Sequence, residues 1–111
     1  VKDKKIGNIL VREQILKDFP PKELRKVIDE GKKDIKSGIV ISISIFEDKV
    51  GLAVGVSKDL TSKYDAVVLA KAASIILGGK GGGGRKDFAQ AGGVDKNKIE
   101  EAFEEISKKI N

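Results

Sequence analysis

The residues best suited to binding chemistry lie in one stretch, residues 78–93, which reads GGKGGGGRKDFAQAGG. This stretch holds eight of the 13 glycines in the chain. Because glycine has no Cβ, successive backbone amides can approach an anion closely and form a concave site for it. Lysine adds a mobile positive charge, and arginine adds a planar fork that suits phosphate. The stretch therefore predicts a phosphate-binding loop formed by Gly79, Lys80, Gly81, Gly82, Gly83, Gly84, Arg85 and Lys86.

Other interpretations of the glycine run fit the sequence less well. A flexible linker usually mixes serine with glycine, and residues 78–84 contain no serine. The spacing Gly79-x-Gly81-x-x-Gly84 matches the dinucleotide fingerprint formally, but here the run follows a predicted helix rather than a strand. A P-loop needs Ser or Thr after its Gly-Lys pair, and this chain has Gly81 there. NAD and ATP sites are therefore disfavoured.

The composition excludes several kinds of catalytic chemistry. The chain has no Cys and no His, so it offers neither a Ser-His nor a Cys-His nucleophile and disfavours a zinc site. Its aspartates are scattered beside predicted turns, with no pair spaced for acid–base work. We therefore expect no catalytic residue and no metal ligand. Phe88, next to the basic run, could stack on a nucleobase or pack in the core, and the sequence does not decide between these roles.

The net charge of the chain, like the glycine-rich loop, indicates an anionic partner. Lys and Arg number 22 against 17 Asp and Glu, which gives a formal net charge of +5 and favours anionic partners such as nucleic acid. We expect neither a membrane-spanning segment nor a signal peptide. The lack of Cys suits a cytoplasmic location, and the Lys, Glu and Ile content resembles thermophile usage. The absence of Met predicts a processed piece or an excised domain of a longer chain.

Hydrophobic periodicity predicts the elements that carry this loop. We expect strands over residues 6–11, 39–46, 50–56 and 88–91, the second and third forming an antiparallel hairpin around Glu47-Asp48-Lys49. A first amphipathic helix follows Pro20-Pro21 and ends near Ser37-Gly38, with Gly38 in the left-handed cap. A second helix runs from Asp65, its predicted cap, to about Leu77.

The last helix has the clearest two-sided pattern. Asp95 is its predicted cap, and its apolar face consists of Ile99, Ala102, Phe103, Ile106 and Ile110. Glu100, Glu101, Glu104 and Glu105 fall on the solvated face. The resulting order, β-α-β-β-α-loop-β-α, predicts an α/β fold with one mixed sheet and helices packed on it. We find no internal repeat or linker, so residues 1–111 are predicted to form a single domain.

The stretch from Gly78 to Gly93 resembles the signature of the DHH-associated nucleic-acid-binding domain. The shared features are a glycine run, an Arg, an Asp, an Ala-Gln pair and a Gly-Gly pair before the final helix. Such a domain closes alanyl-tRNA synthetases, and a related one follows the core of DHH phosphoesterases such as RecJ-type exonucleases. Leu24-Arg25 and residues 54–61, VGVSKDLT, are more similar to the synthetase branch. The chain departs from the pattern by one extra glycine and by Lys86, where proline is common.

The resemblance implies a tRNA-binding appendage without its own activity. In that family the domain holds the outer corner of tRNA, here expected to be tRNA(Ala), and helps position it for aminoacylation and editing. It implies no cofactor in this chain, whereas ATP, Mg²⁺ and Zn²⁺ belong to the aminoacylation and editing domains upstream. Two alternatives stay open: the nucleic-acid-binding half of a DHH phosphoesterase, and a structural module that joins two copies of the chain.

Overall fold

A single mixed sheet forms the centre of the computed structural model, which describes residues 2–110. The strands are β1 (Lys2–Ile6), β2 (Ile9–Lys17), β3 (Ile39–Phe46), β4 (Lys49–Val56), β5 (Gly82–Gly84) and β6 (Phe88–Gly93). The helices are α1 (Leu24–Ile35), α2 (Ala66–Ile76) and α3 (Ile99–Lys108). The strands lie in the order β1-β2-β3-β4-β6-β5. Strands β2 and β3 are parallel, and the other neighbours are antiparallel.

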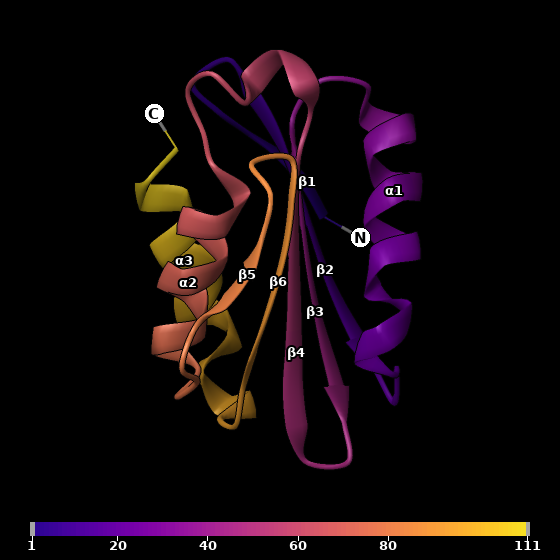
Figure 1. The fold of residues 1–111 in the computed structure, drawn as a ribbon, viewed down its shortest axis with the longest axis vertical. Coiled ribbons are helices and arrows are strands. Elements are labelled where there is room, and N and C mark those ends of the chain that lie inside the picture. Colours follow the sequence, from indigo (N-terminus) through magenta and orange to yellow (C-terminus); the bar gives the residue numbers. More distant parts are fainter. Residues whose placement is uncertain (1, 111) are drawn as a thin grey trace.

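The helices cover both faces of the sheet, as Figure 1 shows: α1 lies on one face, and α2 with α3 on the other. The predicted α/β fold with a mixed sheet is therefore confirmed. The parallel β2–β3 pair requires a crossover connection, and α1 provides it. None of the helices within residues 2–110 is long and apolar enough to cross a membrane.

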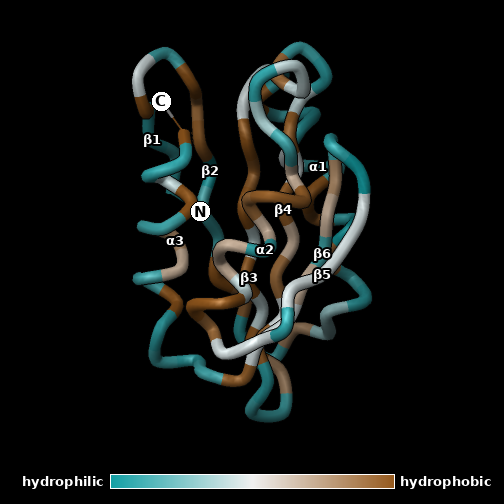
Figure 2. Tube along the Cα trace, turned by 60° about the vertical axis from the view of Figure 1, so that its left-hand side comes forward, coloured by the Kyte–Doolittle hydropathy of each residue, from teal (hydrophilic) through white to brown (hydrophobic). Residues whose placement is uncertain are grey.

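Alternating side chains of the central strands build two apolar cores. Ile39, Ile41 and Ile43 point toward α2 and α3, whereas Val40 and Ala53 pack under α1. In Figure 2 the hydrophobic colour is concentrated on the central strands, and the segment around β5 is a pale tube at one edge. The predicted apolar face of α3 is confirmed, because all five of its residues are buried.

The first predicted strand was wrong in its extent. Residues 6–11 are not one strand: Gly7, at φ +62°, and Asn8 form a turn between β1 and β2. Arg12 ties this hairpin to the rest of the molecule, with its Nε 2.8 Å from Asp3 Oδ1 and its Nη1 3.1 Å from Asp34 Oδ2 on α1. The polar composition of β1 gave no strand pattern because this edge strand is mostly exposed.

Two predicted helix ends also need correction. Lys36, not Gly38, is the residue that caps α1, with φ 64° and ψ −50°, whereas Gly38 lies two residues later with φ 151°. Gly38 is needed for another reason, because a Cβ there would overlap the carbonyl oxygen of Leu10. Asp65 caps α2 as predicted, accepting a 2.9 Å hydrogen bond from the Val67 amide. Asp95 caps a 3-10 turn over residues 96–98 that precedes α3 rather than α3 itself.

The hairpin that joins β3 to β4 forms as expected. Glu47 and Asp48 both have positive φ, 51° and 64°, which is the geometry of a type I′ turn between two strands. Lys49, which the sequence assigned to the turn, begins β4 instead. Ile45 and Phe46 at this end of β3 are only half-buried.

Candidate nucleic-acid interface at the glycine-rich edge

The glycine run, predicted as a loop, forms the outermost strand of the sheet. It leaves the end of α2, and Gly82, Gly83 and Gly84 then pair with Ala91, Gln90 and Ala89 of β6. The sequence did not reveal this strand because strand propensity reflects side-chain packing, and glycine has no side chain to pack. All three glycines of β5 are exposed, as are the predicted cations at positions 80, 85 and 86.

Several glycines of the run are required by the domain's own packing. A Cβ on Gly82 would overlap the carbonyl oxygen of Gln90, and one on Gly84 would overlap that of Phe88. A Cβ on Gly79 would overlap the carbonyl oxygen of Gly92. At Gly83, in contrast, a Cβ would have no heavy atom within 4 Å beyond its chain neighbours. Close approach to β6 therefore explains three of these glycines without any ligand.

Ser74 on α2 fastens the start of the run, a role that the sequence did not reveal. Its Oγ donates to the carbonyl oxygen of Gly92 at 2.5 Å and accepts from the Gly81 amide at 3.1 Å. Its carbonyl oxygen accepts from the Gly79 amide at 2.8 Å. The amides of Gly79 and Gly81 thus already have partners, which reduces the predicted set of anion-binding amides. The position of Ser74 within an apolar, alanine-rich helix was the sequence signal that could have indicated this role.

The hairpin geometry indicates which amides face outward. Arg85 and Phe88 exchange both backbone hydrogen bonds, at 2.7 and 3.3 Å, across the β5–β6 turn. Bonded and non-bonded pairs alternate along an antiparallel ladder, so the next bonded pair is Gly83 with Gln90. This alternation directs the amides of Gly82 and Gly84 away from β6. Within β5, the amides of Gly82 and Gly84 are thereby available at this edge.

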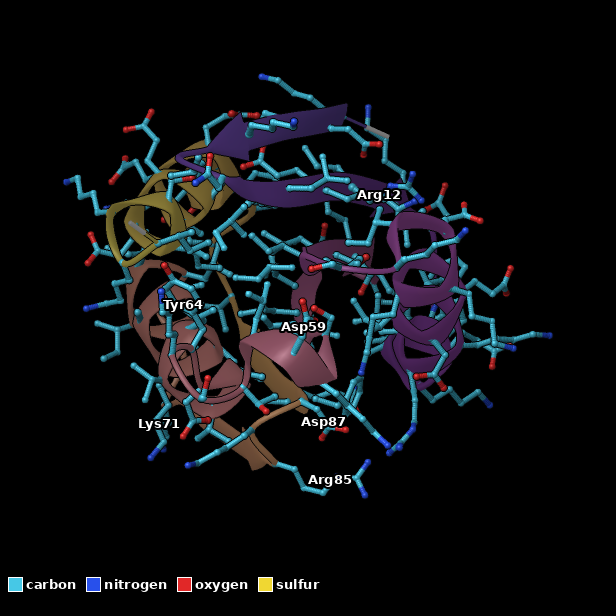
Figure 3. The ribbon with its side chains drawn as sticks, turned by 90° about the horizontal axis from the view of Figure 1, so that it is seen from above. Arg12, Asp59, Tyr64, Lys71, Arg85 and Asp87 are labelled. Carbon is cyan, nitrogen blue, oxygen red and sulfur yellow. The ribbon has the colours of Figure 1, made fainter. Side chains whose placement is uncertain are left out.

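Positive side chains flank this edge from the β5–β6 turn and from α2. The Arg85 side chain is 65% exposed and has its Nε 3.3 Å from Asp87 Oδ1. In Figure 3 it extends away from the body of the molecule, on the opposite side from Arg12. Lys71 on α2 lies next to the run, since a Cβ on Gly81 would be 3.5 Å from its Cγ. The sequence did not point to Lys71 because it lies nine residues before Lys80, on a different element.

Phe88 occupies a different place from the other predicted site residues. Its ring is only 7% exposed and packs with Leu24 and Ile28 of α1. The guanidinium carbon of Arg25 lies over the ring, 4.7 Å from its centroid. Core packing therefore accounts for Phe88, and direct base stacking on its ring stays a prediction that would require Arg25 to move.

Comparisons with known proteins indicate the family of the chain. Residues 7–111 match the DHHA1 domain family. The chain is 48% identical over 101 residues to the alanine–tRNA ligase of Parvibaculum lavamentivorans, which covers 90% of this chain and 11% of that protein. It is 43% identical over 106 residues to the Bradyrhizobium diazoefficiens ligase, covering 95% of this chain and 12% of that protein. The chain thus spans about a tenth of the length of these curated relatives.

A solved structure extends the likeness from sequence to fold. The crystal structure of the C-Ala domain from Aquifex aeolicus alanyl-tRNA synthetase superimposes with a TM-score of 0.92 at 30% sequence identity. The match covers 99% of this chain and 98% of that domain. The chain therefore belongs to the DHHA1 domain family, and over nearly its whole length it is similar to the C-Ala domain of alanyl-tRNA synthetase.

Proposed function

We propose that this domain binds tRNA, with the β5 edge as its contact with the phosphate backbone. The observation that carries this proposal is the exposed glycine strand, with outward amides at Gly82 and Gly84 between Lys80 and Arg85. Backbone amides aimed at solvent beside cations are a suitable cradle for phosphate oxygens. The resemblance to alanyl-tRNA synthetase favours tRNA over other anionic partners.

In the longer protein the domain would serve the ligase reaction indirectly. We propose that it holds the outer corner of tRNA(Ala) while aminoacylation and editing domains of the same cytoplasmic chain act on the acceptor end. ATP, Mg²⁺ and Zn²⁺ would belong to those domains. The role of this chain would be to keep the tRNA at a high effective concentration near both active sites, which requires binding but no catalytic group.

A double substitution tests this proposal. Lys80→Ala combined with Arg85→Ala removes two exposed cations from the edge, and neither change leaves a buried group without a partner. We expect weaker binding to a tRNA(Ala) transcript, with the slope of log K against log salt reduced by about 0.7–0.9 for each phosphate that the variant no longer neutralises. Fluorescence anisotropy at several salt concentrations measures both quantities.

A matched control separates a local effect from net charge. Lys98→Ala with Lys108→Ala removes the same charge at exposed positions beside α3 and at its end. We expect this variant to bind tRNA nearly as the unaltered domain does. If both double variants weaken binding equally, net charge rather than the β5 edge determines binding. If neither weakens it, the proposed interface is wrong.

A further inference from the structure

The contact between Arg25 and Phe88 creates a planar surface beside the β5–β6 turn. Arg25 lies in the first turn of α1, with its guanidinium carbon 4.7 Å from the ring centroid of Phe88. A guanidinium over an aromatic face is held by cation–π attraction, which is weak when exposed and stronger when one side is dry. Here the ring below is 7% exposed, so its side of the contact is dry.

The opposite side of Arg25 is open. Its side chain is 55% exposed, although Phe88 beneath it is buried. The nearest acid is Asp29, whose Oδ2 is 4.0 Å from Arg25 Nε and is itself exposed, so this pair is weak. The guanidinium therefore has one face on the core and one face toward solvent, which is the arrangement by which arginine planes stack on unpaired bases of RNA.

Hydrogen bonds fix this surface relative to the proposed phosphate contacts. Gln90 Nε2 on β6 donates to the carbonyl oxygen of Pro21 at 3.3 Å, just before α1. Lys32 Nζ on α1 donates to the carbonyl oxygen of Asp87 at 3.2 Å, within the turn that Arg85 begins. Because residues before and within α1 are joined in this way to β6 and to the turn, Arg25 cannot shift far from the glycine edge without breaking these bonds.

Cations surround the exposed face of Arg25. A surface hollow of about 550 Å³ is lined by Lys22, Arg25, Lys26, Asp29, Glu30 and Lys33. Four of these six residues are positive, so the hollow attracts a phosphate backbone, while the two acids among its lining residues disfavour a free anion there. An uncharged planar group attached to a phosphate chain suits such a hollow better than a phosphate alone.

We propose that Arg25, held flat on Phe88, is a stacking platform for an unpaired nucleobase of the bound RNA. This inference rests on the proposed function and deepens it by adding a contact to a base beside the contacts to phosphates. The sequence offered Phe88 as a candidate for stacking on a base. Because Arg25 covers the Phe88 ring, the stacking role is assigned to Arg25 instead. The phosphate of the stacked nucleotide lies toward the cations of α1.

Substitution of Arg25 by lysine tests the platform, because lysine keeps the charge and removes the plane. We expect Arg25→Lys to weaken binding to the tRNA(Ala) transcript by about tenfold, as expected when one base is no longer stacked, with the salt slope unchanged. Lys26→Ala, one residue along the same exposed helix, is the matched control and should lower the slope with a smaller effect on affinity. Thermal unfolding of each variant checks that the fold is retained.

The outcomes distinguish the platform from the proposed function. Equal affinity of Arg25→Lys and the unaltered domain overturns the platform, and so does weaker binding accompanied by a reduced salt slope. If, in either case, the variant with both Lys80→Ala and Arg85→Ala still binds tRNA more weakly than the unaltered domain, the proposed contact at the β5 edge is retained and only the platform is rejected. A blunt-ended RNA duplex in which every base is paired offers no unpaired base, so Arg25→Lys should bind it as well as the unaltered domain does.

Discussion

Ser74 is the residue on which the geometry of the glycine edge depends most directly. It is fully buried, and its one hydroxyl joins α2 to the start of the glycine run and to β6. A hydroxyl can donate one hydrogen bond and accept others, so a single atom satisfies both the Gly92 carbonyl and the Gly81 amide. The buried end of the run is thus held in place while its outer face stays exposed.

Removing this hydroxyl should destabilise the domain. Ser74→Ala leaves a carbonyl and an amide without partners, at a cost of about 1–3 kcal/mol in the free energy of unfolding. Urea unfolding measures the change. Ser44→Ala is the control: Ser44 is equally buried, but its Oγ has no hydrogen-bond partner within the described residues, so we expect little or no change in stability. Equal destabilisation at the two positions would show that the Ser74 hydrogen bonds contribute nothing specific.

At the scale of elements, β5 is unusual in being a strand made of glycine. A strand without side chains gains nothing from packing and loses more backbone entropy than other strands. Its pairing with β6 is so close, however, that side chains at Gly82 and Gly84 would meet the backbone of β6. Gly82 and Gly84 therefore allow β5 to fit against the sheet, and all three glycines leave its outer edge without side chains.

Two alanine substitutions distinguish glycines that are needed for packing against β6 from a glycine that is not. Gly82→Ala should destabilise the domain by about 1–3 kcal/mol, because the new methyl group overlaps the Gln90 carbonyl oxygen. Gly83→Ala places its methyl in open space, so stability should be unchanged or rise by about 0.4–1 kcal/mol. Thermal unfolding distinguishes the two variants.

The same pair of variants also reports on tRNA. The methyl group of Gly83→Ala would keep a phosphate away from the neighbouring amides of Gly82 and Gly84. We therefore expect a several-fold decrease in affinity with the salt slope unchanged, since no charge is removed. A Gly83→Ala domain that binds tRNA as tightly as the unaltered one would show that these amides are not approached closely.

Across the whole molecule, charge is distributed unevenly over the layers. The last helix carries Glu100, Glu101, Glu104 and Glu105, whereas the hollow over α1 and the β5 edge are lined mainly by Lys and Arg. The net charge of +5 therefore understates the field at the basic side. An anionic partner approaching the domain would be directed toward the side that carries the proposed contacts.

Asp59 connects two layers of the molecule and gives its stability a dependence on pH. Its carboxylate accepts 2.6 Å hydrogen bonds from the Ser37 hydroxyl after α1 and from the Ser57 hydroxyl after β4. These two bonds, the Ser37 bond foremost, lower the pKa of Asp59 below its ordinary value of 3.8. Ser57 Oγ also accepts from the Gly38 amide at 2.9 Å, so the carboxylate is part of the joint between α1 and β3.

The lowered pKa predicts the sign of the acid response. A depressed pKa means that the carboxylate stabilises the folded state fully above the unfolded value, and that this contribution disappears as the pH falls through the folded value. Asp59→Asn should therefore be less stable than the unaltered domain near neutral pH, and its stability should change less on acidification. Urea midpoints measured from about pH 6 to about pH 2 test this; Ser37→Ala should reproduce part of the effect.

The sequence by itself determined the elements whose signals are local. The strand over residues 39–46, the cap at Asp65 and the apolar face of α3 could each be identified from residues near one another in the chain, and each is found as predicted. Periodicity and capping depend on neighbouring residues, so sequence alone was sufficient there. The pattern of residues 78–93 was also specific enough to indicate the family.

Only the tertiary structure decided how the proposed site is formed. That β5 is a strand, that the Gly79 and Gly81 amides are already bonded, and that Arg25 covers Phe88 all depend on partners distant in the sequence. The polar strand β1 likewise depends on pairing with β2 and on the ion pairs of Arg12. Edge strands and glycine strands have no side-chain pattern of their own, because the backbone of a neighbouring strand determines their conformation.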